Sequence, residues 1–104
     1  MLTEKDYCDK DTCVALEELG YKENPFFPHI LLYEAHKFLR EEKGLHIEID
    51  RVGYDWLVSV IETKNNLCLA VKNRCQSYEE ALLEGIKAAV KKLKEEKYED
   101  VDSA

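Results

Sequence analysis

The stretch LHIEIDRVGYDWLVSVIETKNNLCLAVK, residues 45–72, decides the fold of this chain. It holds three apolar segments, 45–50, 54–62 and 67–72, separated by turn-forming residues. In the first and third segments apolar residues alternate with polar or small ones, which is the pattern of a strand with one buried face. The second segment is apolar on both faces, as in the centre of a sheet. The stretch therefore predicts three strands with 54–62 in the middle.

Short turns join these strands. Residues 51–53, Arg-Val-Gly, offer a glycine for the positive φ angle that tight hairpins need. Residues 63–66, Thr-Lys-Asn-Asn, are of the types that favour turns. Because both connections are short, successive strands must run antiparallel.

Two segments with helical periodicity flank the predicted sheet. Residues 30–43 carry one apolar stripe and are followed by Gly44, which can end a helix; the stripe is Leu31, Ala35, Phe38 and Leu39. Ser77-Tyr78-Glu79-Glu80 is a capping box. It opens a helix to about Lys97, with a stripe of Leu82, Ile86, Ala89, Val90 and Leu93. We therefore expect an α+β core over residues 31–97, in α-β-β-β-α order, with a three-stranded antiparallel sheet and both long helices on one face.

The remaining residues form appendages of the same domain. In residues 1–30, Asp9 or Asp11 can cap a short helix that ends near Gly20. A proline-containing arm follows, in which Phe26 and Phe27 are expected to pin the chain to the body of the domain. Residues 98–104 form an acidic tail with nothing to bury, and we expect it to fray.

Composition bounds the class of protein. The chain has 104 residues, of which 45% are hydrophobic and 36% charged, as in a soluble single-domain protein. No apolar run is long enough to cross a membrane, so no membrane association is expected. The N-terminal residues lack the apolar core of a secretory signal, which predicts a cytoplasmic protein. The four cysteines are then expected to be reduced thiols.

The net charge of −7 disfavours nucleic acid as a partner, because an acidic surface repels phosphates. The same charge allows another hypothesis, an acidic decoy that occupies the nucleic-acid groove of a host protein. One face of the last helix carries three lysines, Lys87, Lys91 and Lys94. If the chain does bind nucleic acid, these are the candidate residues. Pairs such as Glu84 with Lys87 and Lys91 with Glu95 favour an ordinary solvated helix face instead.

Residues able to carry chemistry are few. His29, His36 and His46 lie on different predicted elements that do not obviously converge, and no catalytic motif accompanies them. The spacings of Cys8 with Cys13 and of Cys68 with Cys75 do not match a structural zinc site. We therefore predict no catalytic residue, no metal, no cofactor and no enzyme activity.

The sheet face away from the long helices is the candidate interaction surface. Alternation places on it His46, Glu48, Asp50, Leu57, Ser59, Ile61, Cys68 and Ala70. Among these residues, Leu57, Ile61 and Ala70 form a small apolar patch. A patch of this kind fits the binding of a protein partner or of a second copy of the chain. The favoured interpretation is cover by the N-terminal helix and arm, because that short helix needs something to pack on. The candidate partner-binding residues are Leu57, Ile61, His46, Ala70, Phe26 and Phe27.

The order of elements from Leu31 to Leu93 resembles the double-stranded-RNA-binding domain. That family places lysines at the start of its last helix and a histidine-bearing loop between its first two strands. Here those places hold Ser77-Tyr78-Glu79-Glu80 and Arg51-Val52-Gly53. The resemblance therefore implies the architecture without the residues that bind RNA.

In sequence the chain resembles small uncharacterised proteins carried by phages and mobile elements of gut anaerobes. The shared strings are Leu32–Ala35, Phe38–Gly44, His46–Glu48, Tyr78–Leu82 and Gly85-Ile86. They are mostly helix caps and core positions, so the resemblance implies a common fold and transfers no catalytic residue. Together these observations predict a non-catalytic protein-interaction module, derived from a phage or mobile element, that binds a partner or itself through the outer sheet face.

Overall fold

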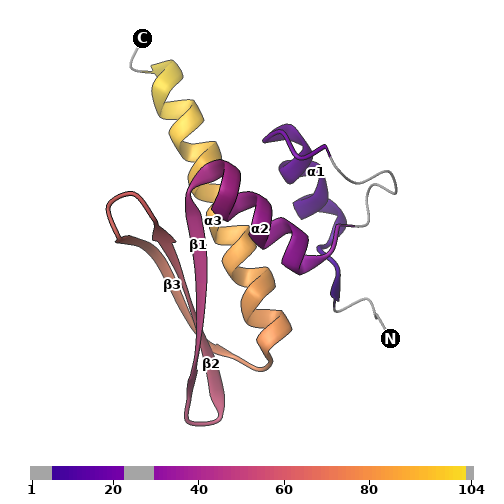
Figure 1. Ribbon diagram of the computed structural model, residues 1–104, viewed down its shortest axis with the longest axis vertical. Helices are drawn as coiled ribbons and strands as arrows, with labels where there is room; N and C mark the ends of the chain where they lie inside the picture. The colour runs from indigo at the N-terminus through magenta and orange to yellow at the C-terminus, as the bar shows by residue number, and fades with distance from the viewer. Residues whose placement is uncertain (1–5, 23–29, 103–104) are drawn as a thin grey trace.

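The computed structural model describes residues 6–22 and 30–102 of the chain, with side chains up to Glu96. Its elements are α1 (Lys10–Glu18), α2 (Leu32–Lys43), β1 (Leu45–Val52), β2 (Asp55–Glu62), β3 (Leu67–Cys75) and α3 (Tyr78–Asp102). Figure 1 shows three layers, in which α2 and α3 cover one face of the sheet and α1 lies on the far side of these helices. The predicted α+β fold, with two long helices on one sheet face, is confirmed.

The sheet is antiparallel in the order β1-β2-β3, so the doubly apolar strand is central as predicted. β1 is longer than expected and pairs Val52 with Asp55 around a two-residue turn. Gly53 opens that turn with a φ of 62°. A glycine at this position suits the turn, because a positive φ there matches the twist of the strands.

The pairing of β3 with β2 contains a bulge that the sequence pattern did not predict. Val60 pairs with Ala70 while Ile61 pairs with Cys68, so Leu69 is an extra residue on β3. Both Leu69 and Ala70 consequently pack against the core. The expectation that Ala70 lies on the outer face is wrong, because one inserted residue reverses the side on which later residues of the strand lie.

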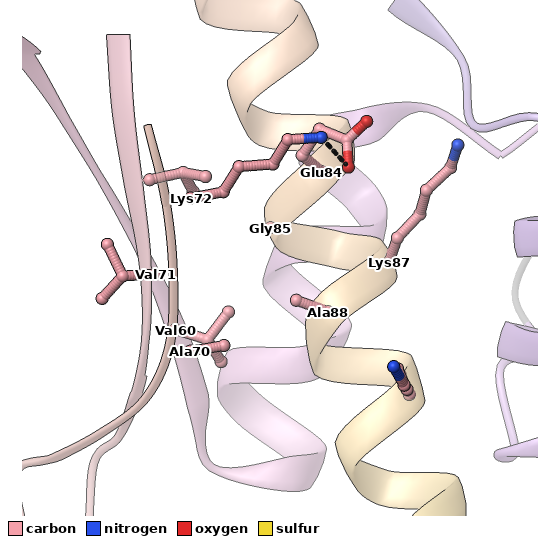
Figure 2. A pocket seen from close by; sticks show the side chains of 10 residues that line it. Val60, Ala70, Val71, Lys72, Glu84, Gly85, Lys87 and Ala88 are labelled. Carbon is pink, nitrogen blue, oxygen red and sulfur yellow. Dashed lines mark ion pairs between the residues drawn. The ribbon is translucent and has the colours of Figure 1, made fainter. Parts of the chain in front are cut away.

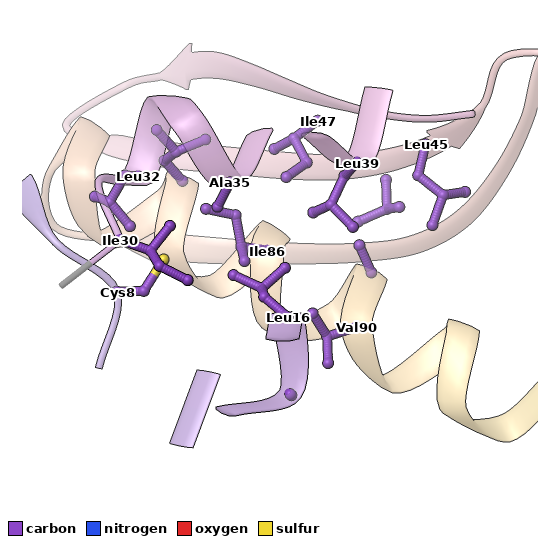
Figure 3. Packing of buried hydrophobic residues seen from close by; sticks show 14 of the residues in the cluster. Cys8, Leu16, Ile30, Leu32, Ala35, Leu39, Leu45, Ile47, Ile86 and Val90 are labelled. Carbon is purple, nitrogen blue, oxygen red and sulfur yellow. The ribbon is translucent and has the colours of Figure 1, made fainter. Parts of the chain in front are cut away.

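A single core lies between the sheet and the helices (Figure 3). Ile86 of α3 and Leu39 of α2 are fully buried there, opposite Ile47 of β1. Gly85 lets α3 approach the sheet closely, since a Cβ at this residue would lie 2.6 Å from Ile47 Cγ2 and 2.8 Å from Val58 Cγ2.

The helix ends largely follow the predicted signals. Gly44 ends α2 with a φ of 66°. The Ser77 hydroxyl accepts a hydrogen bond from the Glu80 N–H at 3.1 Å, but the Glu80 carboxylate accepts from Gln76 N–H and not from Ser77. α3 continues to Asp102, past the predicted end at Lys97, because no glycine or proline stops it.

The N-terminal helix packs on the helices and not on the sheet. Asp9, one of the two predicted caps, accepts the Thr12 N–H at 2.9 Å and starts α1. Cys13 and Leu16 are fully buried in the core, and the Cys8 N–H donates to Ile30 O just before α2. The expectation that this helix covers the outer sheet face is wrong, because α1 packs against α3 on the opposite side of the molecule. The Phe26-Phe27 arm lies outside the described residues.

Candidate functional site

The outer face of the sheet carries two rows of three cross-strand neighbours, followed by two pairs. His46, Ile61 and Cys68 form one row across the three strands. The next row is Glu48, Ser59 and Val71, and two pairs of β1 with β2 follow, Asp50 with Leu57 and Val52 with Asp55. No described helix lies on this face (Figure 1).

The apolar members of this face remain partly open to solvent. Leu57 and Ile61 are half-buried, and Cys68 is exposed. Val71 is 60% exposed and takes the place that was assigned to Ala70. Val71 lies on this face only because of the bulge at Leu69. A strict alternation of side chains along β3 would place Val71 on the inner face. The outer-face patch is therefore Leu57, Ile61, Val71 and Cys68.

Charged residues border the outer-face patch on the β1 side. Glu48 and Asp50 are exposed there, and His46 is half-buried at the end of the same strand. An apolar centre with a polar rim is the usual composition of a protein interface.

The histidines are closer than the sequence indicated. The rings of His36 and His46 lie 5.2 Å apart between centroids, which corrects the expectation that their elements do not converge. His36 Nε2 accepts the Ile47 N–H at 3.2 Å. Burial, followed by the charges of His46 and Arg40, lowers the pKa of His36 to about 4. His36 is therefore neutral near pH 7 and links α2 to β1, while His29 lies outside the described residues.

The lysines of α3 are largely engaged by α1. Lys87 Nζ lies 2.9 Å from Asp9 Oδ2, and Lys94 Nζ lies 3.4 Å from Glu18 Oε2. Burial acts to raise the pKa of Asp9, but hydrogen bonds from Thr12 and Lys87 outweigh it and lower that pKa.

The pairs predicted within α3 are replaced. Lys87 bonds to α1, Glu84 bonds to Lys72 of β3 at 3.0 Å, and Lys92 lies 3.9 Å from Glu95. Tertiary packing brings α1 and β3 alongside α3, and their charged groups reach the lysines and Glu84 from outside the helix.

The cysteines do not form a metal site within the part of the chain that the structure describes. Its histidine, cysteine and acidic side chains form no group of three or more that could hold a metal ion. All four thiols are free, and only Cys68 is exposed. Burial, together with Cys13 and nearby carboxylates, raises the pKa of Cys8 to about 12, so this thiol stays protonated.

A groove lies between β3 and α3 (Figure 2). Three small residues are among those that line it, namely Ala70, Gly85 and Ala88. Lys72 reaches across one end of it to Glu84. The described residues thus offer two open surfaces that involve β3. One is the outer-face patch, and the other is this groove.

Comparisons with protein-family models, curated proteins and solved structures give no match to this chain. Among the described residues, no helix is both long and apolar enough to span a bilayer.

Proposed function

We propose that this protein is a non-catalytic interaction module that associates with a protein partner, or with a second copy of itself, through the outer face of its sheet. The observation that carries the proposal is the outer-face patch, which no described helix covers. Contiguous apolar surface that stays open on a folded domain commonly marks an interaction site.

The packing of α1 strengthens this proposal. Because α1 packs on α3 and buries Leu16 and Cys13, it is not available to cover the sheet. Covering Val71, which is 60% exposed, and the half-buried Leu57 and Ile61 would remove apolar area from water. The rim residues Glu48 and Asp50 would stay hydrated and set the orientation of the partner.

The hydrogen bonds of the described residues also favour a non-catalytic role. His36 accepts from a backbone N–H, and the Ser77 hydroxyl serves as a helix cap. These groups therefore have structural partners in place of a catalytic one. We place the protein in the cytoplasm, where its four free thiols would persist.

The test replaces Leu57 with Asp and Ile61 with Lys in one variant, with Tyr33→Lys on α2 as the control. Tyr33 is 65% exposed and lies on a different layer from the sheet, so its replacement changes charge without touching the patch. Association is measured by sedimentation velocity and by capture of proteins from lysate of a gut anaerobe, because the sequence resembles phage proteins of such hosts. We expect the double variant to lose association and the control to keep it. Unchanged association in a double variant with a native circular dichroism spectrum would refute the proposal.

Nucleic-acid binding through Lys87, Lys91 and Lys94 is the weaker alternative. Two of these lysines already bond to carboxylates of α1, and the chain carries a net charge of −7. Binding of this kind would weaken steeply as salt is added. The decoy hypothesis makes a different prediction, competition with nucleic acid for the captured host protein.

A further inference from the structure

The groove between β3 and α3 has the size of a side-chain pocket. It has a volume of about 230 Å³, and its lining includes the small residues Ala70, Gly85 and Ala88. For comparison, an engineered apolar cavity of about 150 Å³ can hold a benzene molecule. The groove can therefore take one aliphatic or aromatic side chain from outside the domain (Figure 2).

β3 forms one open edge of the sheet beside this groove. It pairs with β2 on one side only, and Val71, Lys72, Asn73 and Arg74 are all exposed. Between two irregular points, residues 70–72 pair regularly with residues 58–60. An edge strand presents alternate N–H and C=O groups away from its neighbour, and these can pair with an added strand.

Strand geometry connects the edge to the groove. Ala70 and Lys72 lie on the same sheet face as Val60 and Val58, which is the face that α3 covers. A strand added to β3 would place every second side chain on that face. No described strand occupies the position beyond β3, so an added strand could lie there. Its side chains on the α3 side would then point into the groove between β3 and α3.

The charges around the groove favour an acidic ligand. Its lining has three lysines, Lys72, Lys87 and Lys91, against the single carboxylate of Glu84. Lys72 is bonded to Glu84 and Lys87 to Asp9, while Lys91 has no ion pair with a described residue. Lys91 thus gives the lining one positive charge that no described carboxylate pairs with, on a chain whose net charge is −7.

We propose that this groove binds an extended, acidic peptide segment of a partner protein. The segment adds as a strand to β3, inserts one apolar side chain between β3 and α3, and directs a flanking carboxylate to Lys91. The groove shares Val71 with the outer-face patch, but Leu57 and Ile61 do not line it. The proposal therefore goes beyond the function proposed above, and variants at Leu57 and Ile61 can test the two independently.

The first step of the test selects binders of the full-length protein from displayed random peptides of about six residues, the usual length of a strand. We expect the selected sequences to combine one or two aliphatic or aromatic residues with flanking Asp or Glu. Their affinity, measured by fluorescence anisotropy, should fall as salt is added. A selection that yields no binders, or basic ones, overturns the proposal.

Two variants then locate the site. Ala88→Leu fills the groove with the protein's own side chain, and Lys91→Glu reverses the charge of a lysine whose replacement breaks no described ion pair. We expect each to weaken peptide binding at least about tenfold, a change of about 1.4 kcal/mol. Lys37→Glu on α2 is the matched charge control and should bind as wild type. Equal losses in Lys91→Glu and Lys37→Glu would show that binding follows net charge and would overturn the groove assignment.

Hydrogen exchange distinguishes strand addition from other modes of binding. Peptide should slow the exchange of β3 amides and leave those of β1 unchanged, because only β3 would gain partners. The variant with Leu57→Asp and Ile61→Lys should bind the peptide normally even if it loses association through the outer face. Protection of β3 without peptide, together with a dimer in sedimentation, would show that β3 pairs with a second copy and would overturn the proposal.

Discussion

Replacement of Gly85 by alanine tests the closest contact between α3 and the sheet. The added Cβ would lie 2.6 Å from Ile47 Cγ2 and 2.8 Å from Val58 Cγ2. Carbon atoms pack best at roughly 3.5 to 4.0 Å, so the methyl group overlaps both neighbours by about 1 Å. Both neighbours are β-branched and sit on sheet strands, which leaves them little freedom to turn away.

Two opposing terms set the size of the effect. Overpacking of a core costs about 1 to 3 kcal/mol, and contact with two stiff side chains puts this site in the upper part of that range. Alanine in place of glycine within a helix stabilises the folded state by about 1 kcal/mol. We therefore expect Gly85→Ala to lower the free energy of unfolding by about 1 to 2 kcal/mol.

Urea unfolding followed by tryptophan fluorescence measures this change. Trp56 is the single tryptophan, and its ring lies 5.7 Å from that of Tyr78 at the start of α3, so its emission reports on this packing. A variant with Val58→Ala is the second arm, because it removes one of the two clashing methyl groups. In that background Gly85→Ala should cost at least about 1 kcal/mol less than in the wild type. A Gly85→Ala protein as stable as the wild type would refute the argument.

Two further predictions concern titratable groups. The pKa of His36 falls from 6.5 to about 4 on folding, so between these pH values the unfolded chain binds a proton that the folded protein does not. The contribution of His36 to the free energy of unfolding is therefore complete above pH 6.5 and is lost as the pH falls from 6.5 towards 4. The shift bounds this contribution at about 3 kcal/mol, and solvent screening of a half-buried ring reduces it to about 1 to 2 kcal/mol. His36→Gln can still accept the Ile47 N–H but does not titrate, so it should flatten the pH dependence of urea unfolding; an unaltered slope would contradict this assignment. Among the thiols, Cys68 alone should react quickly with a disulfide reagent in the native protein, and Cys68→Ser should abolish the fast phase, whereas a fast phase that persists would show another thiol to be open.

Local sequence patterns determined most of the fold. The alternation in β1, the doubly apolar β2 and the helical stripes identify elements from neighbours along the chain, since side-chain direction repeats with a fixed period in helices and strands. The same holds for Gly44 and for the capping serine, Ser77, which act on adjacent backbone groups. These features are local, so a sequence shows them directly.

Tertiary structure decided the surfaces that matter for function. The bulge at Leu69 exchanges Ala70 for Val71 on the outer face, and the packing of α1 on α3 leaves that face uncovered. Packing also brings Lys87 to Asp9 and His36 to His46. Each of these outcomes depends on which segments, distant in the sequence, pack against one another in the folded protein. The sequence therefore determined which helices and strands form, while the exposure of their faces depended on long-range packing that no local period encodes.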